Sequence, residues 1–151
     1  MSPLARANAI SRLRTAGIAA SEPRIAIFMH LDGNTSHPTV DAIYQELAET
    51  HPTLSKTTVY NTLKLFASLN LVQQLNIENG ELRYDPDTTP HAHFKCRRCG
   101  CVHDAQVDAL PLPLPHPHIG QLEATQIHFY GLCDQCLAIE SAKQQRQRPE
   151  A

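Results

Sequence analysis

The sequence predicts an α+β fold in two small domains, and three observations support this prediction. Segments with helical periodicity fill the first half of the chain and are followed by a hairpin pattern. All five cysteines lie after Lys95, so the composition changes near residues 85–90. Eleven prolines, four of them in residues 111–117, mark breaks between elements. We expect domains at residues 1–84 and 91–141, a hinge at 85–90 and a disordered tail at 142–151.

The overall composition excludes several classes of protein. A chain of 151 residues with 42% hydrophobic residues can form one core or two small ones. It contains no run of about 18 apolar residues, so we expect no membrane span. The first ten residues lack a secretory pattern, which favours a cytoplasmic protein. The net charge of −2 excludes a strongly basic protein that binds nucleic acid through its overall charge. It is still compatible with a local basic surface.

Four helices are expected in the first half. The first covers residues 5–16 and ends before Gly17, which suits a helix C-terminus. The second begins after Ser21, and the third follows His37, with Pro38 in its first turn. The fourth is capped by Ser55.

The fourth helix has two distinct faces. Val59, Leu63 and Phe66 recur at helical spacing and should face the core. The opposite face is polar, carries two positive charges and includes Lys56, Thr57, Tyr60, Asn61 and Lys64. Residues 71–77 then read as a strand, Asn79-Gly80 as a hairpin turn and residues 82–84 as the returning strand.

Helices closed by a small hairpin describe a winged helix-turn-helix domain. A helix of this kind fits the DNA major groove, where Tyr, Asn, Thr and Lys contact phosphates and base edges. The polar face is equally typical of any solvated surface helix. Periodicity alone leaves both interpretations open.

The cysteines predict a structural zinc site. Cys96 and Cys99 form one CxxC pair, Cys133 and Cys136 form another, and 33 residues lie between the pairs. Two such turns can complete a tetrahedral four-sulfur site, for which Zn²⁺ is the preferred ion. Disulfides or a redox CxxC are the alternatives, but a redox centre needs only one pair. Cys101 is left over and is interpreted as an incidental small residue.

Nitrogen and oxygen donors form a second group in the sequence. His91 and His93 alternate along an expected strand, which places both imidazoles on one face, and Asp104 lies on the returning strand. Imidazole with carboxylate suits Fe²⁺, Mn²⁺ or Zn²⁺. Each residue alone also has an ordinary structural explanation.

Four segments resemble the ferric uptake regulator superfamily, in the same order along the chain. They are HPTVDAIY (37–44), SKTTVYNTL (55–63), HAHFKCRRCG (91–100) and YGLCDQC (130–136). The resemblance covers about residues 5–137. It implies a metal-dependent transcriptional regulator that acts as a homodimer, with an N-terminal winged helix-turn-helix domain and a small C-terminal α/β dimerisation domain that holds the four-cysteine zinc site.

Within this superfamily the chain looks most like the peroxide-responsive branch. That branch binds regulatory Fe²⁺ or Mn²⁺ through three His and two Asp, which match His37, Asp85, His91, His93 and Asp104 here. Iron sensors usually have Glu in place of Asp104, Arg in place of Asn61 and a histidine in place of Thr125. The resemblance also implies that Tyr60 and Asn61 read bases, and that Arg14 and Arg24 contact the DNA backbone or minor groove.

The function that this resemblance implies is repression that peroxide relieves. Metal would set the spacing of the winged helices on an AT-rich palindromic operator in double-stranded DNA. With Fe²⁺ bound, peroxide would oxidise His37 or His91, and DNA would be released. We expect no membrane partner, and no small-molecule substrate beyond the metal ion and hydrogen peroxide.

Other functions remain as alternatives. An iron-, manganese- or zinc-responsive uptake repressor would keep the fold but change the effector. A zinc module without DNA binding, or a small metalloenzyme, is a more distant alternative. An enzyme needs an open metal position with a general acid or base beside it, and the sequence offers no clear one, so we expect no enzyme.

The chain departs from the family pattern in one stretch. Residues 110–118 are rich in proline, which leaves space for only a short turn around 119–124. Residues 125–130 keep strand formers, so dimerisation through a sheet is still expected. Four further histidines lack a partner in the motif and are expected at the surface, namely His103, His116, His118 and His128.

Overall fold

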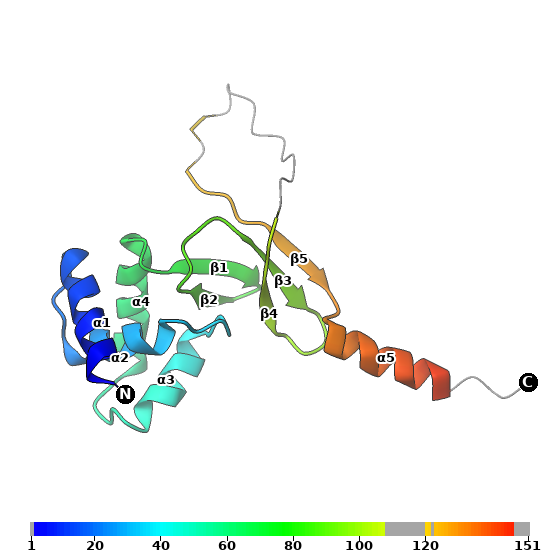
Figure 1. The fold of residues 1–151 in the computed structure, drawn as a ribbon, viewed down its shortest axis with the longest axis horizontal. Coiled ribbons are helices and arrows are strands. Elements are labelled where there is room, and N and C mark those ends of the chain that lie inside the picture. Colours follow the sequence, from blue (N-terminus) through cyan, green and yellow to red (C-terminus); the bar gives the residue numbers. More distant parts are fainter. Residues whose placement is uncertain (1, 108–119, 122, 147–151) are drawn as a thin grey trace, which may run out of the picture. The chain divides into compact units, whose positions relative to one another are not determined.

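The chain forms two compact units, Met1–Thr89 and Pro90–Ala151 (Figure 1). The computed structural model describes residues 2–107, 120–121 and 123–146. Each unit is described below by itself.

The first unit contains four helices followed by a two-stranded antiparallel hairpin. The elements are α1 (Pro3–Thr15), α2 (Glu22–Leu31), α3 (Val40–Ala48), α4 (Lys56–Ser68), β1 (Gln73–Glu78) and β2 (Glu81–Asp85). Asn79 and Gly80 connect the two strands, and Gly80 has a φ of 84°, which the tight turn requires.

Local capping explains where three of these helices begin. The side-chain oxygens of Ser2, Thr39 and Ser55 accept hydrogen bonds from backbone N–H groups in the first turns of α1, α3 and α4. The expectation that Pro38 lies in the first turn of the third helix is wrong. Thr39 is the N-cap instead, and the Pro38 carbonyl accepts a hydrogen bond from the backbone N–H of Tyr84 in β2.

The core of the first unit lies where the helices meet. Val59, Leu63 and Phe66 of α4 are fully buried, as their spacing predicts. The rings of Phe28 and Phe66 meet edge to face, with centroids 6.0 Å apart. Tyr84 brings β2 into the same core, so the hairpin is fixed to the helices.

The second unit is a three-stranded sheet followed by a helix. Its elements are β3 (Ala92–Cys96), β4 (Val102–Ala105), β5 (His128–Gly131) and α5 (Asp134–Arg146). The strand order is β4-β3-β5, with β3 antiparallel to β4 and parallel to β5. Because Cα partners on paired strands share a face, His93 has Asp104 on one side and His128 on the other. The opposite face carries Phe94, His103 and Phe129.

Helix α5 extends further along the chain than the sequence predicts. Residues 142–146 were expected in the disordered tail, but they continue α5 through Arg146. The sequence there is Ala-Lys-Gln-Gln-Arg, whose members have high helix propensity and therefore extend the helix. The whole proline-rich stretch, 110–118, and the end of the tail, 147–151, lie outside the described residues. No helix among the described residues is long and apolar enough to span a membrane.

Candidate metal centres and DNA-binding face

The four-sulfur cluster lies at one end of the sheet in the second unit. Cys96 ends β3, Cys99 lies in the turn toward β4, and Cys133 and Cys136 lie at the start of α5. Backbone hydrogen bonds fix this arrangement: Cys96 donates to the Cys101 carbonyl at 2.9 Å, and the Cys133 N–H donates to the Cys96 sulfur at 3.4 Å. The first bond closes the turn between Cys96 and Cys101, and the second, from a backbone N–H to a sulfur, links the two halves of the cluster.

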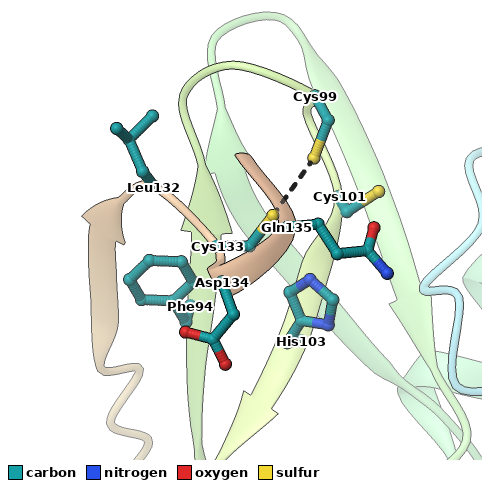
Figure 2. Close-up of a pocket in the computed structure, with 8 residues that line it drawn as sticks. All are labelled: Phe94, Cys99, Cys101, His103, Leu132, Cys133, Asp134 and Gln135. Atoms are coloured by element: carbon teal, nitrogen blue, oxygen red, sulfur yellow. Dashed lines mark hydrogen bonds between the residues drawn. The ribbon is translucent and has the colours of Figure 1, made fainter. Parts of the chain in front are cut away.

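The geometry of the cluster fits a zinc ion. One sulfur from each of the four cysteines lies within 4.8 Å of the other three. A tetrahedral Zn²⁺ with bonds of about 2.3 Å requires sulfurs roughly 3.8 Å apart. The sulfurs of Cys99 and Cys133 are separated by 3.8 Å (Figure 2). None of the five cysteines forms a disulfide bond in this structure.

The cluster has a buried side and an open side. Cys96 and Cys136 are buried, whereas Cys99 is exposed and Cys133 is half-buried. The open side borders a cavity of about 480 Å³ whose lining also includes Cys101 (Figure 2). Cys101 is outside the group of four sulfurs that lie close together.

Protonation differs sharply between the two buried thiols. Backbone N–H groups of Cys99 and Cys133 donate to the Cys96 sulfur and lower its pKa to about 5. Burial, followed by hydrogen bonds to the other thiols, raises the pKa of Cys136 to about 12. Cys96 is therefore ready as a thiolate at neutral pH, whereas Cys136 must release a proton to bind a metal.

His37 and Asp85 lie together inside the first unit. The Nε2 atom of His37 is 3.6 Å from Oδ2 of Asp85, and both side chains are almost fully buried. The pair is positioned by strand β2: the Arg83 guanidinium donates to the His37 carbonyl at 3.2 Å, and Thr39 forms a β-bridge with Arg83. Asp85 ends the strand, and its carboxylate accepts a hydrogen bond from the Asp87 N–H at 2.8 Å.

The backbone at His37 adopts a rare conformation. Its φ is 50°, in the left-handed region that few residues other than glycine adopt. Such strain costs of order 1–3 kcal/mol and persists only where the surrounding structure enforces it. The hydrogen bond from Arg83 of β2 to the His37 carbonyl helps to hold the backbone in this conformation. The buried imidazole then lies beside the buried carboxylate of Asp85.

A second group of donors lies on the sheet of the second unit. Oδ1 of Asp104 is 3.4 Å from Nε2 of His91 and 3.8 Å from Nε2 of His93. The two imidazole rings are 4.4 Å apart between centroids. His93 is buried and His91 is nearly so, while the Asp104 side chain is 41% exposed. This group combines two imidazole side chains with a carboxylate, a combination that suits Fe²⁺, Mn²⁺ or Zn²⁺.

His128, for which the sequence predicts a surface position, is half-buried. Its ring lies beside that of His93, with centroids 6.1 Å apart, and its Nε2 atom is buried. Burial, together with the charge of His93, lowers the pKa of His128 and favours the neutral imidazole. His103, on the other face of the sheet, is exposed as expected, whereas His116 and His118 lie outside the described residues.

The residues expected to contact DNA lie on exposed parts of the first unit. Five of them project from the outer face of α4, namely Lys56, Thr57, Tyr60, Asn61 and Lys64. Arg14 is exposed in the last turn of α1. Arg24 of α2 and Asn61 of α4 line the same shallow cavity of about 250 Å³. A basic side chain and an amide therefore share one hollow beside the exposed helix.

The structure adds one contact that the sequence did not reveal. Nζ of Lys56 lies 2.5 Å from a carboxylate oxygen of Asp41 on α3, so part of its charge is compensated. Lys64 makes no comparable ion pair with the residues that the structure describes. Among the residues that the structure describes, Lys56 thus has an acidic partner and Lys64 has none.

Known proteins resemble this chain in sequence and fold. The peroxide-responsive repressor PerR of Staphylococcus epidermidis is 33% identical over 84% of this chain and 87% of the relative. PerR from Streptococcus pyogenes is 27% identical, covers 87% of this chain and 92% of its own, and gives a TM-score of 0.50. The ferric uptake regulator from Pseudomonas aeruginosa, solved with manganese, is 25% identical, covers 82% and 96%, and gives a TM-score of 0.64.

The family assignment follows from these matches. The model of the Ferric uptake regulator family matches residues 15–112, which include all of α2, α3 and α4, strands β1 to β4 and the five histidine and aspartate donors. The winged-helix unit and the cysteine cluster described above are consistent with it. This chain belongs to the ferric uptake regulator family of metal-responsive regulators.

Proposed function

We propose that this chain is a metal-dependent transcriptional repressor that binds double-stranded DNA and releases it when peroxide oxidises a metal-binding histidine. The observation that supports this most strongly is the donor set of three imidazoles and two carboxylates. Two of these donors are paired in the first unit and three are grouped in the second. The set is the one that the peroxide-responsive branch implies, and PerR relatives match most of the chain.

Two different metal sites follow from the chemistry of the donors. The four sulfurs would hold Zn²⁺ and fix the end of the sheet to α5. The histidines and aspartates would hold Fe²⁺ or Mn²⁺ as the regulatory ion, with His37 and Asp85 supplied by the first unit and His91, His93 and Asp104 by the second. Metal occupancy would then control how the DNA-binding unit is presented.

The outer face of α4 is the surface proposed to enter the major groove. Tyr60 is 47% exposed, and Asn61 lies next to it with an amide that can bond to base edges. Lys64, Arg14 and Arg24 would contact phosphates. The proposed target is a palindrome, because two copies of the unit would read two equivalent half-sites. That the palindrome is rich in A and T is what the family resemblance implies.

A homodimer would use the sheet of the second unit. Strand β5 is at the edge of the sheet, with Phe129 40% exposed and Tyr130 56% exposed. An edge strand with exposed aromatic side chains is a surface that natural proteins usually cover. We propose that a second copy covers it and that the dimer acts in the cytoplasm.

Peroxide sensing would depend on the fate of one imidazole. Fe²⁺ held by these ligands would catalyse cleavage of the peroxide O–O bond and would end in its starting oxidation state, because the imidazole ring itself supplies the two electrons that the peroxide takes up. A ring carbon of His37 or His91 would gain one oxygen atom from the peroxide, and the other oxygen would leave as water. The oxidised ring has N–H groups in place of the nitrogen lone pair, so it no longer binds the metal and the site weakens.

The test compares DNA binding by the Mn²⁺ and Fe²⁺ forms before and after peroxide, measured by fluorescence anisotropy. The DNA is selected from a random library with the Mn²⁺-loaded protein. Both forms should bind, and peroxide should release only the Fe²⁺ form. Persistent binding of both forms after peroxide would indicate an iron-, manganese- or zinc-responsive uptake repressor. Failure to select any DNA would contradict the proposal as a whole.

A further inference from the structure

We infer that His128 gives the second unit a metal-binding set of its own, formed with His91, His93 and Asp104. This inference rests on the proposed regulatory site and adds a residue to its surroundings. It predicts that the second unit can hold a divalent transition metal without His37 and Asp85.

The sheet register places these side chains on one face. His93 pairs with Asp104 across β4 and with His128 across β5, so the three residues form a row across all three strands. Residues opposite each other on neighbouring strands have Cβ atoms about 5 Å apart, close enough to share a ligand. His91 precedes β3, and its ring contacts the His93 ring at an interplanar angle of 57°.

The Nε2 atom of His128 is buried and has no hydrogen-bond partner among the described residues. A buried polar nitrogen without a partner is unusual and points to a missing water or ion. The surroundings favour an ion, because the His93 imidazole lies next to it and the Asp104 carboxylate lies beyond that ring.

The ring spacing is close to that of shared coordination. Two imidazoles bound to one metal at about 2.1 Å have centroids roughly 5–6 Å apart. The rings of His93 and His128 are 6.1 Å apart, and those of His91 and His93 are 4.4 Å apart. The His128 nitrogen is not in the compact donor group of the structure, so its ring must rotate to reach a shared ion. The ring torsion of histidine is broad enough to permit this.

A complete set of metal ligands within the second unit would make metal binding a separate step from the change in DNA binding. The second unit could bind an ion first, and His37 and Asp85 could then displace His128 as the first unit engages. His128 would thus set the affinity of the intermediate state without being required in the final one.

Co²⁺ titration of the full chain with the four-cysteine site filled by zinc tests this inference, with visible absorption as the readout. Three proteins are compared with wild type: a His37→Ala, Asp85→Ala double variant, and the same variant with His128→Gln or His103→Gln added. The double variant should still bind one Co²⁺ per chain. Adding His128→Gln should weaken that binding at least about tenfold. Loss of a residue that only hydrogen-bonds to a ligand already costs about 10–100-fold in metal affinity, and loss of the ligand itself should cost no less. His103→Gln, on the other face, should change nothing.

Each other result has a clear meaning. The inference is overturned if the double variant binds no Co²⁺ or if His128→Gln and His103→Gln behave alike. If wild type itself binds no Co²⁺ beyond the zinc site, the proposed regulatory site fails as well. Retained zinc in every variant confirms that the second unit is folded.

Discussion

The Nε2 atom of His37 lies 3.6 Å from a carboxylate oxygen of Asp85, and both side chains are buried within the first unit. Burying an imidazole and a carboxylate is costly unless each has a strong partner. The backbone at His37 also adopts a left-handed conformation. Buried ionisable side chains and a strained backbone at one position are typical of a functional site, and a bound metal ion would offset both energetic costs.

Replacing His37 with Ala should weaken the regulatory site. Removing one imidazole ligand is expected to lower Mn²⁺ affinity at least about tenfold, since even outer-shell changes cost 10–100-fold. Loss of the free Mn²⁺ signal in electron paramagnetic resonance measures the binding. His51→Ala serves as the control, because His51 is also in the first unit but is not a proposed ligand. Equal affinities for the two variants would remove His37 from the site.

Replacing Cys96 with Ser should release zinc and destabilise the second unit. Cys96 is fully buried, and its sulfur also accepts the Cys133 N–H, so its loss removes a ligand and a link to α5. Zinc content and the thermal unfolding midpoint should both fall. Cys101→Ser is the matched control and should keep one zinc per chain. A folded, zinc-loaded Cys96→Ser protein would contradict the structural role.

Zinc affinity should increase with pH. The pKa of Cys136 is raised to about 12, so the metal-free protein holds this proton at neutral pH and zinc must displace it. The pKa of Cys96 is lowered to about 5, so that thiol contributes no proton above pH 6. Competition with a chromogenic chelator between pH 6 and 8 should give roughly a tenfold gain per pH unit for each proton displaced. Affinity that is independent of pH would show that all four thiols are already deprotonated.

Lys64→Ala should weaken DNA binding by a similar factor for all sequences. Lys64 has no ion pair with the described residues, whereas Lys56 is paired with Asp41, so Lys64 carries more of the available charge. The plot of log affinity against log salt should lose about one unit of slope, as expected for one phosphate contact. Lys143→Ala, on exposed α5, should leave the slope unchanged. If Lys64→Ala alters discrimination between sequences instead, the lysine reads bases and not phosphate.

Local signals explain why much of the fold could be predicted. Ser55 caps α4 and Asn79-Gly80 turns the hairpin, because these residues specify local backbone geometry. The sequence does not locate the start of the third helix correctly, because Pro38 and Thr39 both suit the beginning of a helix. Thr39 prevails because the Pro38 carbonyl is bonded to Tyr84 on a distant strand, which no local rule can anticipate.

The same distinction applies to the site. The CxxC spacing predicts the sulfur cluster directly, because each pair closes a short turn. The position of His128 beside His93 depends on the parallel pairing of β3 with β5, two strands far apart in the sequence. Neither spacing nor family pattern marks that residue, so only the strand register reveals it. The Asp41–Lys56 contact is similar, since it joins two helices.

The central claim is that peroxide acts on a metal-binding histidine, and mass spectrometry of peptides from the Fe²⁺- and Mn²⁺-loaded protein tests it most directly. After treatment with hydrogen peroxide, the peptide that contains His37 or His91 should gain the mass of one oxygen atom in the Fe²⁺ form. The Mn²⁺ form should remain unmodified. Release of DNA by peroxide without any added oxygen at either histidine would contradict the account.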